Sequence, residues 1–207
     1  MNPAGQMRCS HMLLAALLAA GFAPLTVLSA DARHEAAAAD IQPFLPRYLL
    51  MDVQGRAVNH EDFRGRFQLV SFGFISCPDV CPTTLLEVRQ LLEALGDKAG
   101  RVQAIFITVD PERDTREVLR DYTAAFDKRI LGLTGSPELV RRAAESFRIQ
   151  YEKVREPGAA ADNYTMNHTA GMVLLDPRGR FVARFGYGMG AREMAERILA
   201  EIGAEQR

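Results

Sequence analysis

The chain has 207 residues, of which 48% are hydrophobic and 25% charged, and its formal net charge is −1. This length suits one well-buried domain or two small ones, and the balanced charge argues against a basic nucleic-acid binder or an acidic disordered tail. Its three cysteines are too few for a fold held together by disulfides.

The N-terminal segment differs in kind from the rest of the chain. Residues 12–30 carry no charged side chain and are rich in Leu and Ala. Such a run is typical of a secretory signal peptide or a single membrane anchor, and we expect residues 1–32 to be one of the two. Residues 33–40 are predicted to form a linker. The part from 41 to 207 is therefore expected to be one exported domain, and Cys9, which precedes the apolar run, is assigned no role.

Strands alternate with helices from residue 41 onward, and no internal repeat is present. Gln54-Gly55 is a turn signal, and Ser136-Pro137 is a strong helix start, with a capping residue followed by proline. In chain order we expect a hairpin of 48–53 and 57–58, a strand at 68–75, a helix at 82–95, a strand at 102–109, a helix that ends near 126, a strand at 130–133, a helix at 136–147, an extended segment at 151–154, a hairpin of 172–175 and 181–185, and a closing helix at 191–202.

This order of elements predicts an α/β protein with a thioredoxin-like fold. Such a fold has a central mixed β-sheet flanked by helices, here with an N-terminal β-hairpin extension. The near-continuous apolar run 102–109 fits a strand that is covered on both faces. The fold class alone does not determine a function.

Two cysteines with three residues between them, Cys77 and Cys81, lie between the strand at 68–75 and the following helix. A helix N-terminus favours thiolate over thiol, so we expect a reactive pair there. A disulfide closing so small a loop would add little stability. The prolines that follow, Pro78 and Pro82, predict extended cysteines and a helix that starts near Pro82. Two thiolates can form a disulfide or hold a thiophilic metal, and both alternatives remain open.

Two thiolates and one imidazole form a set of ligands that suits copper(I). Of the four histidines, His11 and His34 fall in the N-terminal segment and the linker, and His60 lies in a polar stretch predicted to be solvated. His168 comes shortly before the strand at 172–175. In a thioredoxin-like sheet the segment that enters this strand passes over the cysteines, so His168 is the candidate ligand.

For three further residues, the sequence allows either a structural role or a role in the site. Asp110 follows the strand at 102–109 and is predicted either to cap the next helix or to be an acid near the cysteines. Asp114 fits the cap better. Met166 would share a face with His168 in an extended segment, but a methionine there is more typical of packing than of metal binding.

Three blocks of sequence, at residues 72–82, 108–115 and 163–169, together resemble the Sco (SenC) family of copper-binding assembly proteins for cytochrome c oxidase. The correspondence runs in order from about residue 41 to 203. The resemblance implies a membrane-tethered or periplasmic copper metallochaperone, on the periplasmic side of the inner membrane. Its expected partners are a copper donor protein and either the copper-bearing oxidase subunit or its assembly factors.

Position by position, the resemblance implies that Cys77, Cys81 and His168 are the copper ligands. The chain departs from the family pattern at Asn167, where Asp is frequent. If an acid there orients the imidazole, the departure would affect copper affinity or transfer.

The alternative is a thiol–disulfide oxidoreductase that acts on the cysteines of exported proteins. Cys77 would attack and Cys81 would resolve the mixed disulfide, so the two would form a redox-active pair. This reaction needs no histidine, so a His168→Ala variant separates the two hypotheses. No nucleic acid is expected as a partner, and a monomer is favoured.

Overall fold

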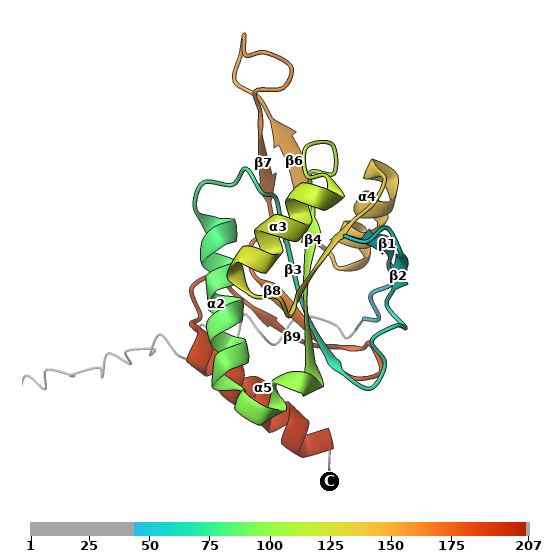
Figure 1. The fold of residues 1–207 in the computed structure, drawn as a ribbon, viewed down its shortest axis with the longest axis vertical. Helices are drawn as coiled ribbons and strands as arrows, with labels where there is room; N and C mark the ends of the chain where they lie inside the picture. Colours follow the sequence, from blue (N-terminus) through green and yellow to red (C-terminus); the bar gives the residue numbers. More distant parts are fainter. Residues whose placement is uncertain (1–43, 206–207) are drawn as a thin grey trace, which may run out of the picture. The chain divides into compact units, whose positions relative to one another are not determined.

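A seven-stranded mixed β-sheet forms the centre of the computed structural model, which describes residues 44–205 (Figure 1). The strand order is β2-β1-β5-β4-β3-β8-β9, with β3, β4 and β5 parallel and the remaining pairs antiparallel. This architecture confirms the predicted α/β class with a mixed sheet. The strands are β1 (Leu49–Asp52), β2 (Ala57–Asn59), β3 (Phe67–Gly73), β4 (Val102–Thr108), β5 (Ile130–Thr134), β8 (Met172–Leu175) and β9 (Phe181–Phe185).

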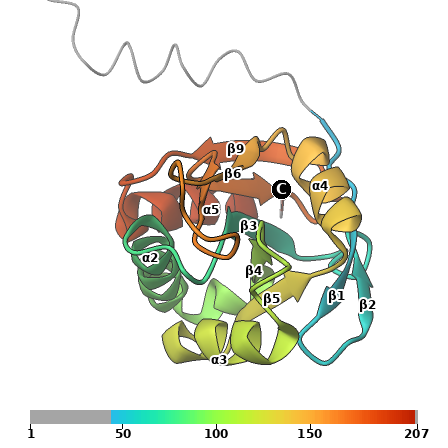
Figure 2. The ribbon, with the colours of Figure 1, turned by 90° about the horizontal axis from the view of Figure 1, so that it is seen from above.

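Helices cover both faces of this sheet (Figure 2). Every residue of β3 is buried, because Leu69 faces one hydrophobic core and Val70 the other. The core around Leu69 contains side chains of α2, α3 and α5, and the core around Val70 contains those of α4. The helices are α2 (Val80–Ala94), α3 (Arg116–Phe126), α4 (Pro137–Ser146) and α5 (Ala191–Glu205), with a 3₁₀ helix, η1, at Gly96–Arg101.

A second, two-stranded sheet consists of β6 (Tyr151–Val154) and β7 (Thr165–His168). The two strands form an antiparallel hairpin that projects beyond the main sheet (Figure 1). The sequence predicts the extended segment at 151–154 but not its pairing with residues 165–168. Tyr151 lies opposite His168, so the candidate histidine is at the end of the hairpin nearest to β8.

Two predictions of local structure at helix starts are wrong. Helix α2 begins at Val80, so Cys81 is helical and not extended. Pro82 fits inside this first turn because the first four N–H groups of a helix have no intrahelical acceptor. Asp114 does not cap α3; the cap is Thr115, whose hydroxyl accepts a hydrogen bond from the Val118 N–H.

The predicted N-terminal hairpin is present, but it is part of the main sheet. Met51 and Asp52 of β1 pair with Thr134 and Leu133 of β5, so β1 and β2 extend the sheet at one edge. In the turn that follows β2, the side-chain oxygen of Asn59 accepts a hydrogen bond from the Glu61 N–H at 2.7 Å.

The predicted signal peptide or anchor (1–32) and the linker (33–40) lie outside the described residues. Within residues 44–205, no helix is both long enough and apolar enough to cross a bilayer.

Candidate functional site

The cysteine loop connects the end of β3 to the start of α2. Cys77 lies in the loop and is half-buried, whereas Cys81 is in the first turn of α2 and only 2% exposed. Both thiols are free, and the Cys81 N–H donates a hydrogen bond to Cys77 Sγ at 3.4 Å. The strand and the helix thus bring the two sulfurs into one small region.

The sulfur of Cys81 packs against a strand position that has no side chain. A Cβ atom added at Gly73 would lie 2.8 Å from Cys81 Sγ and 2.7 Å from the Phe106 ring. Both distances are shorter than van der Waals contact, so glycine is required for the sulfur to occupy this position.

His168, at the end of β7, faces the sulfur of Cys81. Its Nε2 is 3.7 Å from Cys81 Sγ, although the two residues are 87 positions apart in sequence. The other ring nitrogen, Nδ1, is 3.0 Å from the carbonyl oxygen of Thr169. A carbonyl can only accept a hydrogen bond, so Nδ1 carries the proton in this contact and the Nε2 lone pair is directed toward the thiol.

Burial controls the ionisation of both groups. It lowers the pKa of His168 below its ordinary value, so the imidazole is neutral at pH 7. Burial also raises the pKa of the Cys81 thiol to about 12, with a smaller contribution from neighbouring Cys77. For Cys81 the expectation of an acidic thiol at a helix N-terminus is therefore wrong, since desolvation outweighs the helix dipole.

A buried carboxylate supports the cysteine loop from the side of α3. Asp114 is 2% exposed, and its Oδ2 accepts hydrogen bonds from the Ile75 N–H at 3.1 Å and from Thr108 Oγ1 at 2.6 Å. Burial raises the pKa of Asp114 to about 6. This role of Asp114 was not predicted; the available signal was a second acid four residues after Asp110, which itself follows a buried strand.

The structure places Asn167, Met166 and His60 away from a role as copper ligands. Asn167 donates to Glu152 Oε1 at 3.2 Å, on the face of the hairpin opposite to His168. Met166 is buried in the core, as expected for packing. His60, predicted to be solvated, is instead half-buried, because its ring packs against Tyr48 at 6.2 Å between centroids.

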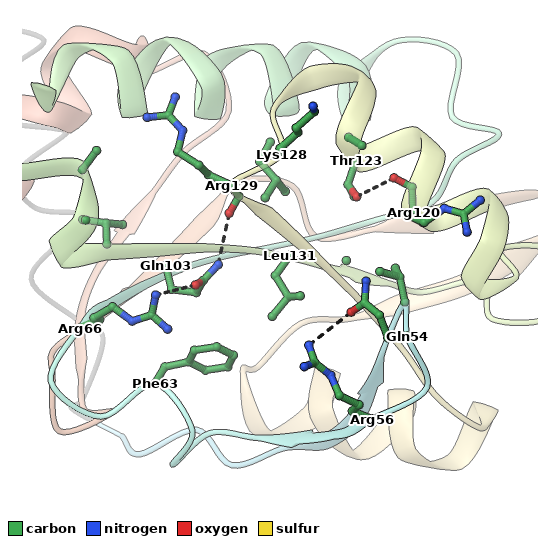
Figure 3. Close-up of a pocket in the computed structure, with 17 residues that line it drawn as sticks. Gln54, Arg56, Phe63, Arg66, Gln103, Arg120, Thr123, Lys128, Arg129 and Leu131 are labelled. Carbon is green, nitrogen blue, oxygen red and sulfur yellow. Dashed lines mark hydrogen bonds between the residues drawn. The ribbon is translucent and has the colours of Figure 1, made fainter.

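Within residues 44–205, no three Cys, His, Asp or Glu side chains are gathered closely enough to qualify as a preformed metal site. A groove of about 550 Å³ lies elsewhere, at the N-terminal ends of β4 and β5 (Figure 3). Its lining contains neither the cysteines nor His168, and the guanidinium of Arg129 is already paired with Asp127. The groove is therefore not part of the site formed by the cysteines and His168. The basic side chains that line it are Arg56, Arg66, Arg120, Lys128 and Arg129.

Comparison with protein families gives a match over nearly the whole chain. The model of the SCO1/SenC family matches residues 10–203. The chain belongs to the SCO1/SenC family. Among its relatives, this SCO1/SenC protein is 35% identical over 147 residues to an SCO2-like protein of Rickettsia prowazekii, a match that covers 71% of each chain. It is 38% identical over 157 residues to the human mitochondrial SCO2 homolog, which covers 75% of this chain and 58% of the human one.

Solved structures of the family share the fold of this SCO1/SenC protein, which establishes the thioredoxin-like class. Copper-bound ScoI of Bradyrhizobium japonicum is 38% identical, with a TM-score of 0.69 over 76% of this chain and 98% of that one. Copper-bound yeast Sco1 is 31% identical, with a TM-score of 0.70 over 79% of this chain and 93% of that one.

Proposed function

We propose that this protein is an exported copper metallochaperone that binds copper through Cys77, Cys81 and His168. Two thiolates and a neutral imidazole are soft donors that suit copper(I), and relatives of this chain have been solved with copper bound. Binding of copper(I) would displace one proton from each thiol and leave a complex in which sulfur carries the compensating negative charge.

The observation that carries this proposal is the distance between His168 Nε2 and Cys81 Sγ. At 3.7 Å with a free lone pair on nitrogen, the two atoms can share one ion without rearrangement of the backbone. Bond lengths like those of zinc, about 2.3 Å to sulfur and about 2.0 Å to nitrogen, place two donors of one ion roughly 3.5 Å apart. Thiol–disulfide exchange by the cysteine pair does not require an imidazole, whereas copper binding gains a third soft donor from it.

The proposal also includes a cellular location and a partner that receives the copper. An exported domain, preceded by a leader or anchor at residues 1–32 and a linker at 33–40, would deliver copper to the copper-bearing subunit of cytochrome c oxidase or to an assembly factor. Protease accessibility of the domain in spheroplasts tests the location, because a protein on the periplasmic side is digested without lysis of the inner membrane.

The test of the ligands compares copper binding by purified, reduced protein with binding by single variants. We expect one copper per chain, and a loss of at least about tenfold in affinity for His168→Ala, Cys77→Ser and Cys81→Ser, measured by competition with a chelator. His60→Ala is the matched control, since His60 packs against Tyr48 outside the proposed site. Unchanged affinity in His168→Ala, with its disulfide-exchange activity retained, would instead support the oxidoreductase.

A further inference from the structure

The hairpin that carries His168 has no hydrogen-bonded strand in common with the main sheet. Strands β6 and β7 pair only with each other, whereas Cys77 and Cys81 follow β3 at the centre of the seven-stranded sheet. Backbone ladders therefore do not fix the imidazole relative to the thiols. Other contacts between the hairpin and the body of the domain must do so.

Tyr164, the residue before β7, makes the main polar contact of this kind. Its hydroxyl donates to Asp110 Oδ1 at 2.8 Å, and its carbonyl oxygen accepts a hydrogen bond from Arg113 Nη1 at 2.8 Å. The Arg113 guanidinium also lies over the Tyr164 ring, 3.7 Å from its centroid, and is paired with Asp110. Backbone, ring and hydroxyl of one residue are thus all held by the loop that follows β4.

This contact continues inward to the cysteine loop through buried groups. Asp110, at 2% exposure, donates its N–H to Thr108 Oγ1 at 2.9 Å, and the Thr108 hydroxyl donates to Asp114. Asp114 in turn holds the Ile75 N–H, two residues before Cys77. A hydrogen-bonded chain therefore runs without a break from the start of β7 to the cysteine loop.

We propose that Tyr164 is a positioning residue, which clamps the β6–β7 hairpin to Asp110 and thereby sets the distance between His168 and the two thiols. This inference rests on the proposed function of the site. Removing the clamp leaves the hairpin held by its connections to α4 and β8, by the buried Met166 side chain and by the Lys153–Glu112 ion pair, so the imidazole is held less firmly at the thiols. Apparent affinity falls in proportion to the fraction of molecules in the binding-competent arrangement.

The test is a double-mutant cycle between Tyr164→Phe and His168→Ala. Tyr164→Phe removes the hydroxyl and leaves the ring under Arg113. We expect copper affinity to fall about three- to tenfold in the otherwise wild-type protein, the range for one hydrogen bond, and to change less than about 1.5-fold in the His168→Ala background. Tyr187→Phe is the matched control, because Tyr187 is 47% exposed, and it should leave affinity unchanged in both backgrounds.

A second measurement needs no copper. Amide hydrogen exchange in the copper-free Tyr164→Phe protein should accelerate severalfold in β7, with exchange in β3 and α5 unchanged. Equal losses of affinity in both backgrounds, or exchange in β7 at the wild-type rate, would overturn the clamp. Equal affinity of wild type and His168→Ala would overturn the ligand assignment instead, and the exchange rates would then decide on the clamp alone.

Discussion

Gly73→Ala tests whether the packing at this glycine sets the position of the Cys81 sulfur. The backbone at Gly73 is in a region that L-residues adopt, so the new methyl group brings no strain of the main chain. Its Cβ would lie 2.8 Å from Cys81 Sγ and 2.7 Å from the Phe106 ring. Normal contacts are about 3.5–4.0 Å, so the sulfur and the ring must together yield roughly 1 Å.

The magnitude follows from two opposing effects. Overpacking of a buried site costs about 1–3 kcal/mol, and replacing glycine by alanine recovers about 0.4–1 kcal/mol through the unfolded chain. We expect a net loss of roughly 1–2 kcal/mol in the free energy of unfolding, measured by urea denaturation of the reduced protein. Copper affinity should fall as well, because the sulfur moves relative to His168.

The matched control is Gly203→Ala in α5, where an added Cβ meets nothing within 4 Å. This variant should gain about 0.5–1 kcal/mol, the difference in helix propensity, with unchanged copper affinity. A Gly73→Ala protein as stable as the wild type, with wild-type copper affinity, would refute the assigned packing of the sulfur.

Three further predictions concern charge near the site. Burial raises the pKa of Asp114 to about 6, so the protonated Asp114 carboxyl stabilises the folded protein fully below about pH 4, and this stabilisation is lost as the pH rises through 6. Relative to wild type, Asp114→Asn should therefore gain up to ~3 kcal/mol in free energy of unfolding between pH 4 and 7. Parallel curves of unfolding free energy against pH for the two proteins would contradict this. If copper binds through Cys81, it has to displace the thiol proton, whose pKa is about 12, so copper affinity measured by chelator competition at pH 6, 7 and 8 should rise at least about tenfold per pH unit; a flat profile would exclude a thiolate ligand. Asn167→Asp should change copper affinity less than about twofold, since residue 167 contacts Glu152 on the other face of the hairpin; a tenfold change would show that its charge reaches the imidazole.

The main sheet was predictable because its signals are local and strong. Strands such as β3 and β4 are long apolar runs, and Ser136 followed by Pro137 is a strong signal for the start of α4. The pairing of β6 with β7 was not predictable, because Thr165–His168 is a short polar strand in which only Met166 is buried. Such a strand exists through its partner and not through its own propensity.

In the candidate site, too, features with a local sequence signal were predictable, and contacts between distant residues were not. The order of elements was enough to bring His168 toward the cysteines, since the segment before β8 passes the end of β3 in this topology. The hydrogen bond from Tyr164 to Asp110 joins residues 54 positions apart, and no sequence pattern around either residue predicts this contact. Even the pKa of Cys81 depended on burial, a tertiary property that overrides its place at a helix start.

That burial bears on the choice between the two chemistries. Burial raises the pKa of the Cys81 thiol to about 12, so this thiol is protonated at pH 7 and is a poor nucleophile in disulfide exchange, which proceeds through free thiolate. A soft metal ion ionises the same thiol by bonding to it and gains a neutral imidazole as a further donor. The features that make Cys81 a slow nucleophile are therefore compatible with holding copper, and they would couple the release of a copper ion bound there to the uptake of protons.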